Sequence, residues 1–311
     1  HGDKGPSCSL TRGADGTLRV RCFGCGFAGD VFHLVAACRS LTLPRDFVEV
    51  LREAAALASI AMPDLPAERE VPMAIGDELF AAIVARMLGL APLRRARDVS
   101  AYLERRRIGQ QAARDGWGAL PAGGAQDAIV RELAAEFGAE ALIGSGLCLR
   151  DERTERLRLV RPGARVLIPW RAEDGRIVSL QRRRIDDGEP RYVASAGRPL
   201  RTPYGLDRLT PSGPVAFVEG AVDVLALREL CARRRFACNV LGLPGVEGWR
   251  PAWAQLAAGR RAYLALDDDE AGDAKAVDMA RDLEAAGARP KRWRPSAKDW
   301  SEVLTSQKER T

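Results

Sequence analysis

Three carboxylates follow an apolar segment in the C-terminal third of the chain. The run 262–266 is apolar and predicts a buried strand, and Asp267, Asp268 and Asp269 come directly after it. In extended geometry Asp267 and Asp269 point to one face and Asp268 to the other, so the first and third form a pair. Packed like charges repel one another, and a buried carboxylate is costly unless a cation lies beside it. The pair therefore favours a cation site, and side chains that simply turn into water are the alternative.

A further carboxylate holds the same kind of position on another predicted strand. Glu219 follows the apolar segment 215–218, and Asp223 comes about one helical turn later, where it can lie on the same side. In open α/β sheets the carboxyl ends of the strands form the ligand crevice, so we expect Glu219 to lie beside Asp267 and Asp269. Taken alone, Glu219 is equally an acid favoured by the dipole at a helix start. Together the three carboxylates favour Mg²⁺ or Mn²⁺, because hard oxygen ligands suit these ions.

Two cysteines near the N-terminus form a second candidate site. Cys22 and Cys25 have C-x-x-C spacing, which on a turn can point both sulfurs at one tetrahedral zinc ion. His1 is a candidate third ligand, and the fourth could be Cys8, Cys38 or a residue before His1. Redox use and two ordinary buried thiols are the alternatives to a Zn²⁺ site.

Arginines gather on the segment that precedes the acidic strands. Tyr192 and Tyr204 interleave with them, and aromatic and basic residues together are typical of a groove that binds nucleic acid or nucleotide phosphates. A solvated charged face is the alternative. The arginines concerned are Arg182, Arg183, Arg184, Arg191, Arg198 and Arg201.

The overall composition is that of a globular protein with a mildly basic surface. Of the 311 residues, 46% are hydrophobic and 29% are charged, and the net charge of +6 is a weak indication of a polyanionic partner. No segment has the apolar length of a membrane span, and the first residues show no export signal. We therefore expect a cytoplasmic protein without a membrane partner, in which the seven cysteines are reduced thiols or metal ligands.

Hydrophobic periodicity predicts the elements that would carry these residues. A strand and two helices are expected first, then a proline-rich linker, then mostly helix and one hairpin, and finally alternating strands and helices that indicate a parallel sheet. The expected helices are 31–39 (capped by Asp30), 45–60, several within 77–115, 131–137, 221–235 and 273–287. The expected strands are 17–22, the hairpin 166–170 and 177–181, and the parallel set 215–218, 237–241 and 262–266.

The acidic motifs resemble those of the bacterial DnaG-type DNA primases, which combine a CHC2 zinc-binding domain with a Toprim catalytic domain. The segment 219–223 (Glu-Gly-Ala-Val-Asp) is similar to the Glu-Gly-x-x-Asp motif of the Toprim domain, and 266–272 is similar to its Asp-x-Asp motif. The segment 298–302 resembles the closing acidic segment, so the resemblance implies that Asp299 is a further carboxylate beside the metal.

The N-terminal residues resemble the CHC2 module of the same family. His1, Cys22 and Cys25 fall on zinc-ligand positions, and the first cysteine ligand is expected three residues before His1. Cys8 falls where the family often has phenylalanine, so it does not count as a ligand.

The middle of the chain resembles the primase core. Similar segments are 101–108, 115–118, 168–170, 174–177, 190–195 and 203–206. In the family, a basic ridge here guides the template and the RNA–DNA product, so the resemblance implies that Arg191 and Arg201 contact phosphates.

The resemblance implies a multidomain fold of α+β and α/β class. Its parts are a small zinc-ribbon β module, a mixed α+β subdomain of the primase core, and a Toprim α/β domain with a central, mainly parallel sheet. The expected boundaries are 1–62 for the zinc-binding module, which is truncated at its N-terminus, 63–73 for the linker, 74–212 for the core subdomain with the basic ridge, 213–295 for the Toprim domain and 296–311 for a C-terminal segment.

The activity implied by the resemblance is RNA primer synthesis on single-stranded DNA. Glu219, Asp267 and Asp269 would hold Mg²⁺ or Mn²⁺, and Asp223 and Asp299 would serve as outer ligands. Ribonucleoside triphosphates, an RNA–DNA hybrid product and a replicative helicase are the implied partners. The chain ends soon after the Toprim motifs, which favours a short phage-type or mobile-element-type version. A Toprim-type nuclease and a non-catalytic protein that binds single-stranded DNA are the alternative functions.

Overall fold

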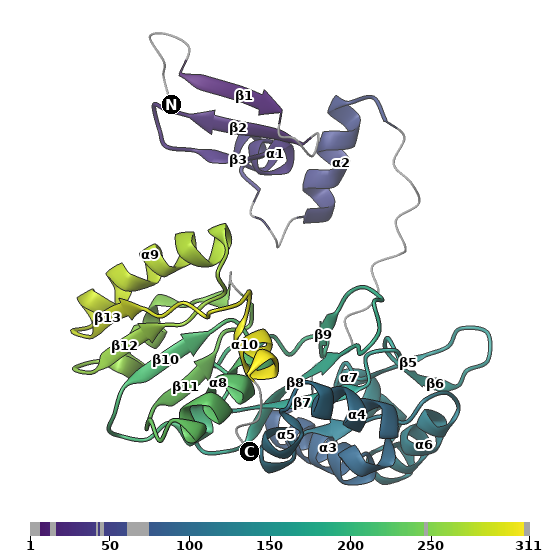
Figure 1. Cartoon of the computed structure of the whole chain (residues 1–311). Coiled ribbons are helices and arrows are strands. Elements are labelled where there is room, and N and C mark those ends of the chain that lie inside the picture. The colour runs from purple at the N-terminus through teal and green to yellow at the C-terminus, as the bar shows by residue number, and fades with distance from the viewer. Residues whose placement is uncertain are drawn as a thin grey trace. The chain divides into compact units, whose positions relative to one another are not determined.

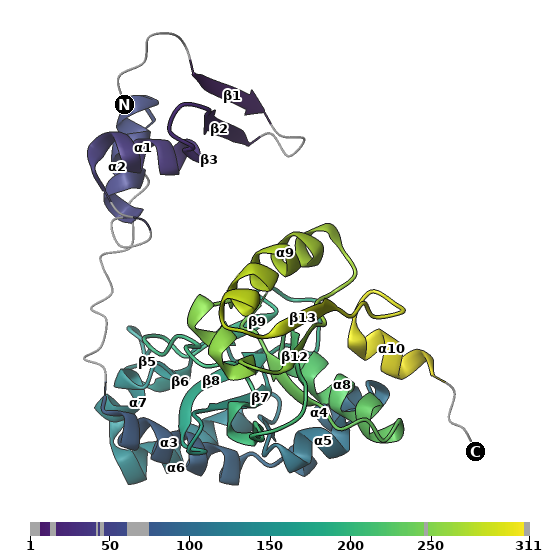
Figure 2. The same ribbon diagram turned by 90° about the vertical axis from the view of Figure 1, so that its left-hand side faces the viewer.

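The structure, a computed structural model, describes residues 7–12, 17–41, 43, 47–60, 75–245 and 248–307 (Figures 1 and 2). The chain divides into two compact units, His1–Glu70 and Val71–Thr311, each of which is described by itself. His1 and the expected linker 63–73 lie outside the described residues, apart from this division. The detailed domain boundaries expected from the sequence therefore stay a prediction.

The first unit is a small antiparallel sheet with two helices. Its strands pair in the order β1-β2-β3, and a hydrophobic cluster of Val35, Ala36 and Val50 lies between the helices. Asp30 ends β3 and caps the first helix, because its Oδ1 accepts hydrogen bonds from the backbone N–H groups of Phe32 and His33. The elements are β1 (Cys8–Arg12), β2 (Leu18–Cys22), β3 (Ala28–Asp30), α1 (Val31–Arg39) and α2 (Phe47–Leu57), which confirms the predicted strand and helices.

The second unit begins with helices packed on an antiparallel sheet. Its strands pair in the order β4-β7-β8-β9, and the β7–β8 pair is the predicted hairpin. The helices are α3 (Asp77–Leu90), η1 (Leu93–Arg95), α4 (Arg97–Arg105), α5 (Gly109–Arg114), α6 (Ala125–Phe137), α7 (Ala139–Gly144) and η2 (Leu206–Arg208). The strands are β4 (Gly118–Ala119), β5 (Cys148–Arg150), β6 (Leu157–Leu159), β7 (Val166–Arg171), β8 (Ile177–Arg183) and β9 (Tyr192–Ala194).

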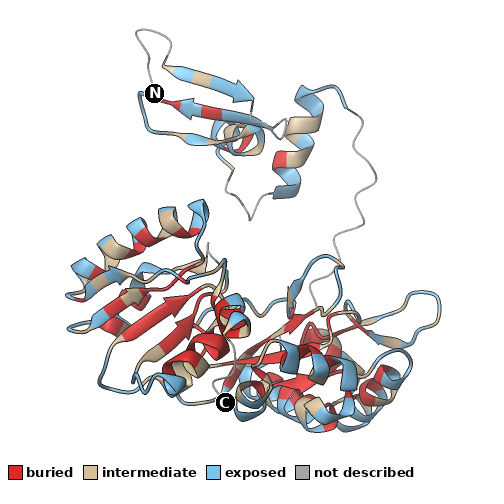
Figure 3. Cartoon of the chain, viewed as in Figure 1, coloured by how far each residue is buried: buried red, intermediate tan, exposed pale blue. Residues whose placement is uncertain are grey.

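A parallel α/β sheet completes the second unit. Its strands pair in the order β11-β10-β12-β13, with Val215 of β10 opposite Asn239 of β11 and Ala262 of β12. All four residues of β10 are buried, as expected of a central strand with helices on both faces (Figure 3). The elements are β10 (Val215–Val218), α8 (Ala221–Arg233), β11 (Asn239–Gly242), η4 (Pro251–Ala257), β12 (Arg261–Leu264), α9 (Glu270–Ala285), β13 (Arg289–Arg292) and α10 (Trp300–Ser306).

Two details of this sheet differ from the sequence prediction. The edge strand β13 has the sequence Arg-Pro-Lys-Arg, which carries no apolar pattern, so periodicity did not reveal it. Helix α9 starts at Glu270 rather than at Asp273, because Asp269 caps it and draws the intervening residues into the first turn.

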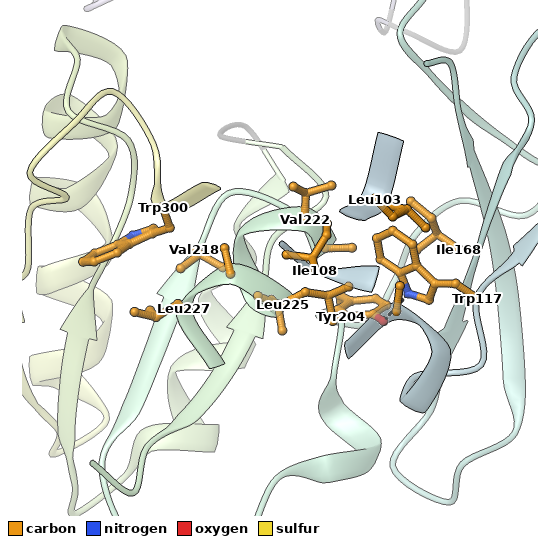
Figure 4. Close-up of a cluster of buried hydrophobic side chains, with 14 of the residues drawn as sticks. Leu103, Ile108, Trp117, Ile168, Tyr204, Val218, Val222, Leu225, Leu227 and Trp300 are labelled. Carbon is orange, nitrogen blue, oxygen red and sulfur yellow. Dashed lines mark hydrogen bonds between the residues drawn. The ribbon is translucent and has the colours of Figure 1, made fainter. Parts of the chain in front are cut away.

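One buried cluster joins the two parts of the second unit. Figure 4 shows Trp117 and Tyr204 at one end of it and Trp300 at the other, with Val218 and Leu225 between them. The indole N–H of Trp117 donates to the Tyr204 hydroxyl at 2.7 Å, and that hydroxyl donates to Asp115 Oδ2 at 2.8 Å. The parallel sheet is therefore fixed to the antiparallel sheet by packing and by a buried hydrogen-bond chain.

Candidate active site

The predicted carboxylates lie together at the carboxyl edge of the parallel sheet. Glu219 follows β10 and Asp267 follows β12, and these neighbouring strands run in the same direction. The backbone N–H of Asp267 donates to Glu219 Oε1 at 3.2 Å, which brings the two segments into direct contact. This is the convergence that the strand-end positions predicted.

Asp269 and Asp299 approach the same place as helix caps. Asp269 Oδ1 accepts a hydrogen bond from the backbone N–H of Gly272 at 2.8 Å at the start of α9. Asp299 Oδ1 accepts one from Glu302 at 2.7 Å at the start of α10. Asp268, which lies between Asp267 and Asp269 in the sequence, instead forms an ion pair with Arg294 at 2.8 Å.

Electrostatic repulsion between the carboxylates contributes to raised pKa values in this cluster. Partial burial, followed by the charges of Glu219, Asp299 and Asp269, raises the pKa of Asp267 to about 7. Asp267 Oδ1 is also buried without a hydrogen-bond partner among the described residues. A buried carboxylate oxygen that faces other carboxylates is stabilised by a cation, so the donor set fits a divalent metal ion.

The pKa values of Glu219 and Asp223 are raised as well. Burial is the main cause in both cases, and neighbouring carboxylates add to it, so that the pKa of Glu219 is raised and that of Asp223 is raised well above its usual value. For Asp223 these neighbours are Asp267, Asp299 and Glu219, while the charge of Arg183 acts in the opposite direction. Asp223 on α8 therefore belongs to the same electrostatic cluster, as its spacing from Glu219 predicted.

The described residues do not form a closed metal-binding cage. In the described ranges, no three His, Cys, Asp or Glu side chains are close enough together to hold an ion. Mg²⁺ usually takes one or two protein carboxylates and completes its sphere with water and substrate phosphates. The cluster is consistent with that mode of binding rather than with a closed, all-protein cage.

Arg292 holds the loop that carries Asp267, and it was not identified from the sequence. Its Nη1 donates to the carbonyls of Leu264 and Leu266 at 2.9 and 2.8 Å, and its Nη2 donates to the carbonyl of Asp267 at 2.7 Å. Its Nε also donates to Asp273 Oδ1 at 3.1 Å. No sequence signal pointed to this role, because the strand that carries Arg292 was itself not predicted.

The six predicted phosphate-binding arginines do not share one environment. Arg182 is buried and donates to the carbonyl of Val160, and Arg198 pairs with Asp77. Arg184 pairs with Asp186 at 2.6 Å. These three guanidinium groups are engaged within the protein and are not gathered with the others, whereas Arg191 and Arg201 are exposed.

Arg183 is the member of this group that lies near the carboxylates. It is buried between two aromatic rings, 5.4 Å from the ring centre of Tyr102 and 5.0 Å from that of Tyr192. Its Nη1 donates to the Tyr192 hydroxyl at 2.6 Å, and its charge lowers the pKa of Asp223. Side chains alternate along β8, so Arg183 faces the site while Arg182 points to the opposite side of the sheet.

In the first unit, Cys22 is the last residue of β2 and Cys25 lies on the turn that follows it. The Ser7 hydroxyl, 3.3 Å from the Cys22 sulfur, is the main cause that lowers the pKa of Cys22 to about 7, and the backbone N–H of Cys25 adds to the effect. A more acidic thiol is a better metal ligand, since the thiolate binds the metal. His1, the third predicted ligand, lies outside the described residues.

Comparisons with known proteins show which proteins the chain is similar to. A family described as Toprim-like matches residues 216–304. The DNA primase of Pseudomonas putida is 27% identical over 234 residues, which make up 70% of this chain and 34% of that protein. The Gene 57 protein of Mycobacterium phage D29 is 32% identical over 141 residues, 45% of this chain and 85% of the phage protein. The chain therefore carries a Toprim-like domain and is a homologue of bacterial DNA primases.

The fold agrees with the sequence similarity to DNA primases. The zinc-binding and RNA polymerase domains of the Aquifex aeolicus primase superpose with a TM-score of 0.61 at 22% identity, covering 97% of this chain and 76% of that one. The expected fold class is thereby confirmed. The chain spans about a third of the length of the curated primase from Pseudomonas putida.

No helix in the described residues combines the length and apolar character that a membrane crossing requires.

Proposed function

We propose that this chain is a DNA primase, a nucleotidyltransferase that makes short RNA primers on single-stranded DNA. The observation that carries the proposal is the contact between Glu219 and the Asp267 loop, with Asp269 and Asp299 beside them at the sheet edge. Similarity to DNA primases suggests the chemistry of this cluster, because nucleotidyl transfer needs divalent cations beside phosphates.

Glu219, Asp267 and Asp269 are the residues that would hold Mg²⁺ or Mn²⁺. When bound, the ions activate the primer 3′-hydroxyl and neutralise charge on the phosphates. Asp267 must be ionised to act as a ligand, and its raised pKa means that it gives up a proton as the site fills. Asp223 and Asp299 stand behind these ligands and orient them.

Arginines near the crevice supply the contacts to nucleic acid and nucleotide. Arg191 and Arg201 are exposed, and in our proposal they contact backbone phosphates of the template or of the RNA–DNA hybrid. Arg183 is held rigidly by the two tyrosines and faces incoming ribonucleoside triphosphates. Arg182, Arg184 and Arg198 act in this proposal only if their present partners are released.

The first unit is proposed to bind Zn²⁺ through His1, Cys22 and Cys25 and to help select the template. The lowered pKa of Cys22 supports this assignment. A replicative helicase is the proposed protein partner, and the cytoplasm is the proposed compartment.

The deciding experiment is primer synthesis by two variants of neighbouring aspartates. Asp269→Asn removes a carboxylate from the cluster but keeps a side-chain oxygen that can cap α9, so the fold should persist. Asp268→Asn is the matched control, because Asp268 pairs with Arg294 outside the cluster. With a mixed-sequence single-stranded template, Mg²⁺ or Mn²⁺ and labelled ribonucleotides, we expect loss of about 10²-fold or more in the first variant and near-normal synthesis in the second.

The same reactions test the two other functions. Metal-dependent shortening of the template without incorporation of nucleotides would identify a Toprim-type nuclease. Template binding without either reaction would identify a non-catalytic protein that binds single-stranded DNA. Full primer synthesis by Asp269→Asn would contradict the metal assignment.

A further inference from the structure

A cavity in the parallel-sheet part of the chain takes no part in the proposed reaction. It has a volume of about 310 Å³ and lies between α8, α10, β12 and β13. Its inner wall is apolar and includes the buried side chains of Leu227, Leu230, Trp300 and Val303. Figure 4 shows Leu227 and Trp300 at one end of the buried cluster. A cavity of this size admits a small ligand or the side chain of a partner.

Aromatic rings form the outer walls of this cavity. Phe236, Tyr263 and Trp293 pack against one another edge to face, with ring centroids 5.1 Å apart for Tyr263 and Trp293 and 5.9 Å apart for Phe236 and Trp293. Phe236 is 38% exposed, although it belongs to this aromatic group. Partly exposed aromatic residues around a concave apolar floor are typical of sites that receive an anchoring side chain.

The rim of the cavity carries two exposed cationic side chains. Arg234 follows α8 and Lys291 lies on β13, and both are exposed. Within the described ranges neither side chain has an ion-pair partner, whereas the neighbouring Arg233 pairs with Glu229 at 2.9 Å. No Asp or Glu is among the described residues that line the cavity. Its electrostatic potential therefore favours an anionic ligand.

The residues that line the cavity favour a protein side chain over a nucleobase as its ligand. Aromatic and basic residues together can stack bases, but the edges of a buried base carry donors and acceptors that need partners. The indole N–H of Trp300 already donates to the carbonyl of Ala265 at 2.6 Å, and the Arg292 guanidinium is occupied by backbone carbonyls. An aliphatic or aromatic side chain needs no such partners.

We propose that this cavity is a docking site for a partner protein, which inserts one apolar or aromatic side chain flanked by carboxylates. The inserted side chain contacts the apolar floor and the rings of Phe236 and Trp293, and the flanking carboxylates lie against Arg234 and Lys291. The site lies on the α8 and α10 face of the sheet, and none of the proposed metal ligands lines it.

The test is peptide binding to the full chain, followed by fluorescence anisotropy. The probe is a fluorescein-labelled synthetic peptide of eight residues in which one phenylalanine stands among aspartates. We expect saturable binding that falls at least about tenfold in the double variant Arg234→Glu/Lys291→Glu. The control Arg94→Glu/Arg131→Glu makes the same change in net charge at exposed positions of the other subdomain and should bind normally.

Two altered peptides separate the parts of the proposal. Replacing the phenylalanine by serine should abolish binding through loss of the anchor, and replacing the aspartates by lysines should abolish it through loss of charge complementarity. Absence of saturable binding by the acidic phenylalanine peptide, or equal binding by wild type and the Arg234→Glu/Lys291→Glu variant, overturns the proposal. It is also overturned if a labelled oligothymidine, rather than the peptide, loses affinity in that variant and keeps it in the control.

Discussion

Asp267 combines a buried oxygen that has no hydrogen-bond partner among the described residues with three neighbouring acids, and this combination has a consequence for stability. Its pKa is about 7 in the folded protein, against about 3.9 in an unfolded chain. Between these two values the folded state holds a proton that the unfolded state has released. The free energy of unfolding of the metal-free protein should therefore fall as the pH rises through this window.

The pH dependence can be assigned to Asp267 by substitution. In Asp267→Asn the decrease in stability between pH 4 and pH 7 should be smaller, and saturating Mg²⁺ should reduce it in the wild type because the ion favours the ionised carboxylate. Urea unfolding followed by tryptophan fluorescence measures both effects. Asp268→Asn should keep the wild-type dependence, and an Asp267→Asn curve that matches the wild type would refute the assignment.

At the scale of single residues, the positions of the carboxylates could be predicted from the sequence better than those of the arginines. Glu219 and Asp267 both follow strands of the parallel sheet, so their proximity at the sheet edge could be predicted. The arginines were grouped by position in the sequence, yet Arg182 and Arg183 face opposite sides of one strand. Side-chain alternation along the strand predicts that Arg182 and Arg183 point to opposite faces. Only the packing of the folded protein decides which of the two faces the site.

At the scale of elements, the start of α9 is fixed by a close approach of backbone. A Cβ atom at Gly272 would lie 2.5 Å from the carbonyl oxygen of Asp267. Gly272→Ala should therefore displace the Asp267 loop and destabilise the protein by about 1–3 kcal/mol. It should also weaken Mn²⁺ binding, which electron paramagnetic resonance of the free ion can measure.

Gly89→Ala is the matched control for this prediction. Gly89 lies in α3, where a Cβ would meet no atom within 4 Å, so the same substitution should stabilise the protein by about 0.5–1 kcal/mol. Chemical unfolding compares the two variants. Equal stabilisation by both would show that the Asp267 loop adapts freely and is not fixed by this contact.

The elements themselves were predictable wherever their periodicity was strong. The hairpin β7–β8, the central strand β10 and the helix after it all follow apolar patterns. The strand β13 does not, because an edge strand of charged residues gains its place from backbone pairing with β12 and from the contacts of Arg292. Such tertiary interactions have no counterpart in local sequence.

At the scale of the whole molecule, the two units differ greatly in the size of their cores. The described core of the first unit contains Val35, Ala36 and Val50, whereas the second unit has three large buried clusters. A small module with so little buried apolar surface often needs an additional source of stability, and a bound metal ion can supply it. If the first unit binds Zn²⁺, its structure should be lost when the metal is removed.

The positions of the tryptophans allow unfolding of the first unit to be distinguished from unfolding of the second. All six tryptophans lie between residues 117 and 300, so tryptophan fluorescence reports on the second unit alone. A zinc chelator should release Zn²⁺ and reduce the circular dichroism signal while the fluorescence spectrum stays unchanged. Cys22→Ser should mimic the chelator. A preparation that contains no zinc and is nevertheless fully folded would contradict the prediction.

Asp269 and Asp299 each begin a helix as well as face the acidic crevice, and this double duty has a mechanical consequence. If the first turn of either helix unwinds, the carboxylate that caps it loses its hydrogen bond to the helix backbone. That side chain can then move away from the other carboxylates. If the cluster binds metal ions as proposed, a protein that pulls on the far end of α9 or α10 would weaken their binding without touching the carboxylates.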